Sequence, residues 1–287
     1  MLTVADSRAV DVRRRIRWGS PLAYGISLVL IAITLGPVIY AILGGFRTTG
    51  QLAARPAALP DPWVLENYEF VLTSEAFWLQ VRNSTVIAVV TTAIVVVFGV
   101  MAAFALSRYQ FKGREALYTF FVVGLLFPAT VAVLPLFILV RSLNLMDNPL
   151  GVILPQAAFA LPITIVILRP FLRALPIELE DAALIDGCSR VGFFWRIVLP
   201  LSGPGLVTVG VLSFVASWNA YLLPLLILGN SPDTYTLPLG VATFSTQYTA
   251  DTAAILAFTS LAMIPALVFF LLAERRIVGG LTGAVKG

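Results

Sequence analysis

Six uncharged stretches of 21 to 25 residues constrain this chain more than any other feature of its sequence. A helix that crosses the hydrocarbon core of a bilayer needs about 20 apolar residues, because each residue advances it by about 1.5 Å. Backbone polar groups in lipid must be bonded internally, and the stretches lack the alternation of barrel strands, so we expect helices. The six stretches are Leu22–Leu43, Thr85–Ser107, Ala116–Val140, Asn148–Leu168, Gly205–Leu228 and Thr252–Ala273.

The composition excludes an ordinary soluble domain. The 287 residues are 59% hydrophobic and 12% charged, whereas soluble domains have about 45–50% apolar and about 25% charged residues. We expect an all-α membrane protein, with a basic segment 1–21 followed by one transmembrane domain over 22–287. Five arginines before the first stretch also suit a signal peptide, but 22 apolar residues exceed the roughly 7–15 of a signal core.

The positions of the basic residues predict the orientation. With the N-terminus inside, the inner segments hold 15 of the 19 lysines and arginines. Cytoplasmic loops carry an excess of these residues. Both termini are therefore expected in the cytoplasm, with the chain crossing the membrane several times.

The residues that the chain lacks exclude several chemistries. It has no histidine, and Cys188 is its single cysteine. This excludes an internal disulfide, Ser-His-Asp catalysis and the common transition-metal sites, so no catalytic or metal-binding residues are expected. No phosphate-binding loop occurs, so any ATP that drives this protein binds another chain. The absence of charge within the six stretches favours a path for a neutral, hydroxyl-rich solute.

The segment between the fourth and fifth stretches predicts two short helices. Pro176 can open the first, and the acidic residues after it suit the positive end of the helix dipole. Gly187 can take the left-handed conformation that ends a helix, and Ser189 can cap the next one. The second helix is expected to end near Pro200. The helical period places four of its residues on one face: Val191, Phe194, Trp195 and Val198.

This segment resembles the EAA signature of ABC importer permeases. The signature reads Asp181-Ala182-Ala183, then Gly187, then Ile197-Val198-Leu199-Pro200. Asp181 departs from the usual glutamate, which keeps the charge but shortens its reach. The resemblance implies that the coupling loop 175–200 docks in a groove of an ATPase subunit. The residues implied in coupling are Glu180, Asp181, Ala182, Ala183, Asp186, Gly187, Ile197, Leu199 and Pro200.

Further segments are similar to the carbohydrate-uptake type of this family, within it to the six-span permease subunit of maltose importers. They are Ser217–Pro224, Leu237–Gly240 and the C-terminal tail 274–287. By that resemblance, Asn230–Asp251 contacts a binding protein and Lys286–Gly287 reaches into the ATPase dimer.

The resemblance implies a multi-pass type I importer bundle in the cytoplasmic (inner) membrane of a bacterial or archaeal cell, together with several partners. The partners are a second permease in a heterodimer, two ATPase subunits or domains that bind ATP and Mg, an extracytoplasmic substrate-binding protein, and membrane lipid. No nucleic acid is expected, because the basic residues are spread over several loops. The chain carries no cofactor of its own and is a transport subunit rather than an enzyme.

Five polar or aromatic residues within the stretches are candidates for the solute path, since aromatic rings stack on sugars and amides bridge hydroxyls: Gln156, Ser217, Trp218, Asn219 and Tyr221. Bonds between helices are the competing interpretation for the polar ones, and anchoring at the membrane interface for Trp218 and Tyr221. The solute stays open among a sugar, a glycerol phosphate ester, an amino sugar and a peptide. A secondary transporter or channel is a more distant alternative, as is an enzyme that uses the acidic cluster of the coupling loop.

Overall fold

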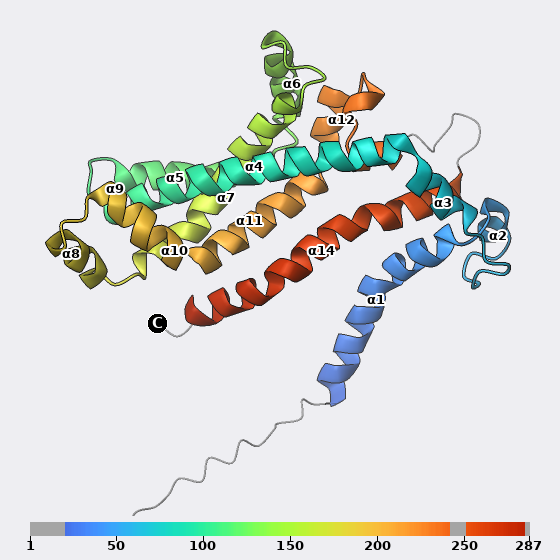
Figure 1. Ribbon diagram of the computed structural model, residues 1–287, viewed down its shortest axis with the longest axis horizontal. Helices are drawn as coiled ribbons and strands as arrows, with labels where there is room; N and C mark the ends of the chain where they lie inside the picture. Colours follow the sequence, from blue (N-terminus) through green and yellow to red (C-terminus); the bar gives the residue numbers. More distant parts are fainter. Residues whose placement is uncertain (1–20, 242–250, 285–287) are drawn as a thin grey trace, which may run out of the picture.

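The computed structural model describes residues 21–241 and 251–284, and every regular element within them is helical (Figure 1). The long helices are α1 (Pro21–Gly45), α4 (Glu75–Arg108), α7 (Pro149–Arg173), α11 (Gly203–Trp218) and α14 (Thr252–Ala284). The shorter ones are α2 (Thr49–Ala54), α3 (Glu66–Thr73), α5 (Arg114–Gly124), α6 (Val133–Ser142), α8 (Glu178–Ile185), α9 (Arg190–Phe193), α10 (Leu199–Leu201), α12 (Leu222–Leu228) and α13 (Leu237–Gly240). A π-helical turn, Phe194–Val198, joins α9 to α10, and a 3₁₀ turn, Pro232–Thr234, precedes α13.

The bundle is built around α4, which packs along α7 and α11. Helix α14 packs on α11, and α1 contacts the rest of the bundle mainly through α14 (Figure 1). Close contact between α4 and α7 depends on Gly99, where a Cβ atom would lie 2.4 Å from Thr164 Cγ2. Small residues at such crossings let helices approach closely without a clash.

Four helices in the described part of the chain are long and apolar enough to cross a membrane: Pro21–Gly45, Glu75–Arg108, Pro149–Arg173 and Thr252–Leu271. A fifth candidate is the pair Arg190–Leu201 and Gly203–Trp218, which is bent by 74°. Four of the six apolar stretches therefore lie in helices of spanning length, and the other two are interrupted.

The prediction of one continuous helix over Ala116–Val140 is wrong. Helix α5 ends at Gly124, and turns occupy 125–132 before α6 begins. Pro128 explains the end of α5, because it lacks the N–H that would bond to the carbonyl of Gly124. Pro135 falls in the first turn of α6, where a missing N–H costs no helical bond.

The stretch Gly205–Leu228 is divided in the same way. Helix α11 ends at Trp218, and α12 begins at Leu222, so that Pro224 lies in its first turn. Continuing the helix would require an N–H on Pro224 to bond to the carbonyl of Ala220. In both interrupted stretches, a proline lies shortly after the helix ends, four residues after Gly124 and six residues after Trp218.

The two ends of the bundle carry different structures. Helices α8 to α10 gather at one end of the long axis, and α2 and α3 lie at the other (Figure 1). At the α2 end, Arg47 is 3% exposed and donates to the carbonyls of Gln51, Arg55 and Pro56. Its charge is thus compensated by carbonyl dipoles at the end of α2.

Candidate functional site

The coupling loop has the predicted helix–glycine–helix form. Gly187 joins α8 to α9 with a φ of +75°, in the left-handed region that favours glycine. The N–H of Cys188 donates to the carbonyl of Ala183 over 2.8 Å, which closes the end of α8. The hydroxyl of Ser189 accepts from the N–H of Gly192 over 3.1 Å and caps α9 as expected.

The start of α8 agrees with the sequence prediction except for the position of Pro176. Glu178, Glu180 and Asp181 occupy its first turn, as predicted. Pro176 lies two residues before the first helical residue, so it precedes the helix instead of opening it. Three carboxylates at a helix N-terminus stabilise it through the helix dipole.

The predicted face of the second helix is wrong. Phe194 and Val198 are buried, but Val191 and Trp195 are 67% and 53% exposed. Phe193 takes the buried position instead. The cause is the π-helical turn Phe194–Val198, which holds an extra residue and shifts the buried face away from the α-helical period.

The nine residues proposed for coupling fall into three groups. Asp181, Ala182, Asp186, Gly187 and Pro200 are exposed. Glu180, Ile197 and Leu199 are half-buried, and Glu180 lies 3.8 Å from the guanidinium of Arg108. Ala183 is 4% exposed, because it packs into the chain's own core beside Phe193 and Leu172.

A group of arginines surrounds one carboxylate beside the coupling loop. Glu115, at the start of α5, accepts from Arg114, Arg169 and Arg173. Arg169 is 4% exposed, bonds to the carbonyl of Leu106 and lies 3.9 Å from the centre of the Tyr118 ring. The hydrogen bond from Arg169 is the main reason why the pKa of Glu115 is lowered. This carboxylate therefore stays ionised and links α5 to α7.

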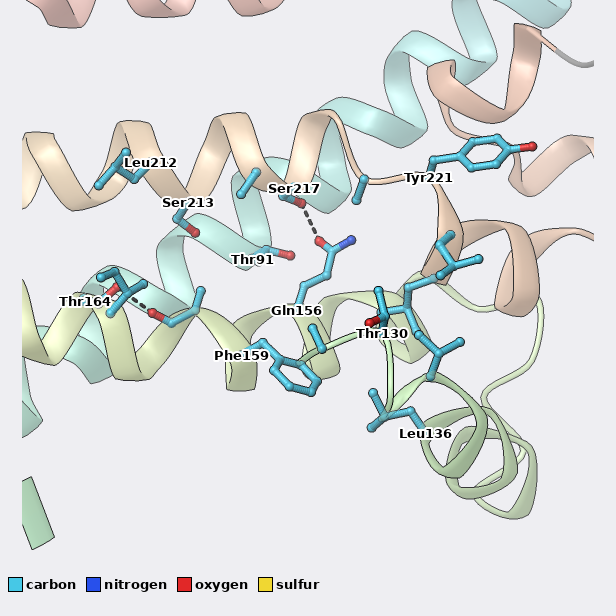
Figure 2. Close-up of a pocket in the computed structure, with 18 of the residues that line it drawn as sticks. Thr91, Thr130, Leu136, Gln156, Phe159, Thr164, Leu212, Ser213, Ser217 and Tyr221 are labelled. Carbon is cyan, nitrogen blue, oxygen red and sulfur yellow. Dashed lines mark hydrogen bonds between the residues drawn. The ribbon is translucent and has the colours of Figure 1, made fainter. Parts of the chain in front are cut away.

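A cavity of about 450 Å³ lies near the middle of the bundle, beside the interruption between α5 and α6 (Figure 2). Helices α4, α7 and α11 form its walls, and the segments 129–136 and 220–223 complete them. The described residues that line it include no charged side chain. It brings together three of the five residues proposed for the solute path: Gln156, Ser217 and Tyr221.

Several polar atoms of the cavity wall lack a protein partner. Gln156 Oε1 accepts from the hydroxyl of Ser217 over 2.6 Å, as Figure 2 shows. Within the described part of the chain, Gln156 Nε2, Thr91 Oγ1 and Ser213 Oγ are buried without a hydrogen-bond partner. A buried unpaired polar group costs about 1–3 kcal/mol. The residues that carry these atoms line the cavity together with the aromatic residues Phe159 and Tyr221.

Trp218 and Asn219 lie outside the cavity lining. The indole N–H of Trp218 donates to the carbonyl of Ala262 over 3.3 Å, which joins α11 to α14. The amide of Asn219 donates to the carbonyl of Val215 over 3.0 Å, at the end of α11. Thr91 and Ser213 are cavity residues that sequence reasoning missed, since a lone hydroxyl in an apolar helix carries no signal of its own.

Comparison with known proteins places the chain in a family. Residues 95–278 match the model of the family described as binding-protein-dependent transport system inner membrane component. This match covers more than half of the chain and includes the whole coupling loop. The chain belongs to this family of ABC importer permeases, whose members are multi-pass proteins of the cytoplasmic membrane.

Curated relatives agree over nearly the full length. The chain is 39% identical to the trehalose transport system permease protein SugB of Mycobacterium tuberculosis, with 91% of this chain and 96% of that protein covered. It is 32% identical to the diacetylchitobiose uptake system permease protein NgcG of Streptomyces coelicolor, with 91% and 87% covered. A crystal structure of a bacterial ABC transporter for the acidic polysaccharide alginate contains a chain with the same fold, at a TM-score of 0.76 and 21% identity over 88% of this chain and 95% of that one.

Proposed function

We propose that this chain is one of two permease subunits of an ATP-driven importer for a neutral sugar. The family membership carries this proposal, because the matched residues include the coupling loop and every described cavity residue except Thr91. The solutes named for two of the relatives, SugB and NgcG, are trehalose and diacetylchitobiose, which are uncharged, hydroxyl-rich sugars. A cavity wall without charge, bearing unpaired hydroxyl and amide groups, suits such a solute.

In the membrane, the chain would cross six times with both termini in the cytoplasm. The pairs α5–α6 and α11–α12 would each act as an interrupted crossing, which is tolerated where backbone lines a cavity. The domain 22–287 would follow the basic segment 1–21, most of which lies outside the described residues. The cytoplasmic side would then carry the coupling loop and the tail 274–287, whose last residues, Lys286 and Gly287, also lie outside them.

The partners follow from the same proposal. A second permease completes the path as a heterodimer, and two separate ATPase subunits bind ATP and Mg. An extracytoplasmic binding protein delivers the sugar to the outer loop Asn230–Asp251, of which 242–250 lies outside the described residues. Neither catalysis nor a cofactor is assigned to this chain.

The coupling loop would meet the ATPase through its exposed surface. The exposed coupling residues Asp181, Ala182, Asp186 and Gly187 lie in sequence around Ile185, which is 86% exposed. An apolar side chain at that exposure, next to two carboxylates, suits a partner groove that is apolar with a basic rim. The conformational change would come from ATP binding to the partner, which changes the relative stability of inward-facing and outward-facing states.

The experiment pairs co-purification with uptake. The chain is purified in mild detergent with its co-expressed partners, identified by mass spectrometry, and reconstituted in liposomes that contain ATP. Asp181→Asn is compared with Glu178→Gln, since both residues are exposed carboxylates in the first turn of α8 and only Asp181 belongs to the signature. We expect Asp181→Asn to lose sugar uptake and Glu178→Gln to keep it. Purification of the chain without any ATPase, or sugar uptake independent of ATP, would contradict the proposal.

A further inference from the structure

Arg108, in the last turn of α4, holds the coupling loop from within the chain. Its side chain is 8% exposed. One terminal nitrogen, Nη2, donates to the carbonyls of Leu172 and Leu175 over 2.9 and 2.6 Å, and Nη1 lies 3.8 Å from Glu180 Oε2. A guanidinium has five donors in a planar fork, which lets one side chain reach several acceptors. Arg108 thus joins α4 to the end of α7, to the linker after it, and to α8.

The second helix of the coupling loop rests on the same turn of α4. The ring centre of Phe104 lies 5.0 Å from that of Phe194 and 6.4 Å from that of Phe193. The guanidinium of Arg190 lies 5.5 Å from the centre of the Tyr109 ring. Both helices of the coupling loop are therefore in contact with the end of α4, one through Arg108 and one through aromatic rings.

The covalent connections of the coupling loop, in contrast, are interrupted on both sides. The linker 174–177 before α8 is not helical. After α10, the chain bends by 74° where α11 begins. Neither connection continues the coupling loop as a straight helix into α7 or α11, so its position relative to the bundle also depends on side-chain contacts.

Helix α4 is continuous from the coupling loop to the opposite end of the molecule. Its 34 residues contain no proline and extend over about 51 Å, at about 1.5 Å per residue. Thr91, midway along it, lines the cavity. At its far end, Asn83 donates to the carbonyls of Asp233 and Tyr235, and Ser84 accepts from the N–H of Leu237. One helix therefore contacts the coupling loop, lines the cavity, and bonds to the loop that contains Asp233, Tyr235 and Leu237, which we call the far loop.

We propose that Arg108 is a positioning residue that fixes the coupling loop to α4, so that α4 carries the displacement of the loop to the cavity and the far loop. The inference rests on the proposed function and deepens it by naming the route of coupling. Without Arg108, the loop would move at its two connections while α4 stays in place. Basal ATP hydrolysis by the partner would continue without driving transport, and its stimulation by the binding protein would be lost.

The first test measures function in the reconstituted complex with its ATPase and binding protein. Radiolabelled trehalose and diacetylchitobiose serve as probes, and ATP hydrolysis is measured with and without the binding protein. Arg108→Gln is expected to assemble normally, keep basal hydrolysis, and lose uptake and stimulated hydrolysis by about tenfold, as expected for a lost charge-assisted hydrogen bond. Arg108→Lys keeps the charge without the fork and is expected to be intermediate. Arg173→Gln is the matched control, because Arg173 is 46% exposed and its bond to Glu115 does not involve the coupling loop.

The second test measures whether the coupling loop and the end of α4 move together, and it requires no transported sugar. In a Cys188→Ser background, spin labels at Glu178→Cys and Gln110→Cys report the distance between the coupling loop and the end of α4. We expect this distance to stay unchanged when Mg-ATP is added to the complex, and to change once Arg108→Gln is introduced. A nucleotide-dependent change in the presence of Arg108, or normal coupling in Arg108→Gln, would overturn the inference. A complex that binds no ATPase at all would instead contradict the proposed function.

Discussion

Replacing Gly187 by alanine should uncouple the complex, and the structure gives the size of the effect. Gly187 has a φ of +75°, and a Cβ atom placed on it would meet no other atom within 4 Å. The cost of a side chain is therefore conformational alone. An L-residue with a Cβ atom pays about 1–2 kcal/mol in the left-handed region. If α8 and α9 relieve this strain by leaving their turn, the population with the docking geometry falls about 5- to 30-fold.

Gly113 provides a matched control for this experiment. Its φ is +88°, and a Cβ atom there also meets nothing within 4 Å. It lies between α4 and α5, outside the coupling loop. Gly113→Ala should therefore carry a similar conformational cost without the loss of coupling. Gly187→Asn should fall between wild type and Gly187→Ala, because asparagine tolerates the left-handed region better than alanine does.

The assay compares sugar uptake and binding-protein-stimulated ATP hydrolysis at equal amounts of complex in the membrane. We expect Gly187→Ala to lower both about 5- to 30-fold, while Gly113→Ala stays close to wild type. Equal activity of Gly187→Ala and wild type would refute the argument that the left-handed turn sets the docking geometry. Equal losses in Gly187→Ala and Gly113→Ala would show that backbone strain outside the coupling loop also lowers uptake and stimulated ATP hydrolysis.

Three further predictions concern the bundle, the cavity and the ionic cluster. Gly99→Val should lower the free energy of unfolding by about 1–3 kcal/mol through its clash with Thr164, measured as a lower Tm in detergent. Gln156→Leu should lower sugar uptake about tenfold with assembly unchanged, because it removes the bond to Ser217 and the free amide; uptake at the wild-type rate would exclude a solute contact there. The pKa of Glu115 is lowered below 4.5 in the folded chain, so its stabilisation is complete above about pH 4.5 and is lost as the pH falls through the lower, folded value. Thermal unfolding between pH 3 and pH 6 should therefore show an acid-side loss that Glu115→Gln reduces.

The sequence was most informative where a local rule sets the structure. The glycine and the serine that follow α8 have the backbone geometry and the cap that their residue types predict. Both depend on contacts within about five residues, which a sequence displays directly. Hydropathy likewise located the four helices of spanning length, since an uncharged run of more than 20 residues has few other structures available.

The interruptions were harder to predict, because proline has two opposite effects. Pro155 and Pro162 lie inside α7, which continues through them. Pro128 and Pro224 each follow the end of a helix, by four and by six residues. Hydropathy cannot separate these cases, since the outcome depends on whether neighbouring helices and polar groups can satisfy the freed carbonyl. The two breaks that occurred are also beside the cavity, where the backbone has space and polar neighbours.

The long-range contacts between α4, α5 and α7 could not be predicted from the sequence for a different reason. Arg108 and Leu172 are 64 residues apart, and Arg169 and Glu115 are 54 apart. Such pairs follow from how α4, α5 and α7 cross, which residue spacing does not encode. A basic residue at the inner end of a span is also explained by topology alone, so Arg108 and Arg169 gave no separate signal.

The contacts of Arg108, Thr91 and Asn83 all lie on α4, which differs from the other long helices in its lack of internal proline. Of the four longest helices, α1, α7 and α14 contain internal proline, and α4 does not. A helix with all of its backbone bonds resists bending, whereas a proline leaves a carbonyl free and a point of flexure. The chain therefore has one long helix without internal proline that contacts the coupling loop, the cavity and the far loop, and its breaks lie in the segments around that helix. The proposed coupling of ATP hydrolysis to transport requires one helix that transmits the displacement of the coupling loop and neighbouring segments that can bend. Introducing a proline at Val96 of α4 tests it: transport should be lost even though the coupling loop and the cavity residues are unchanged.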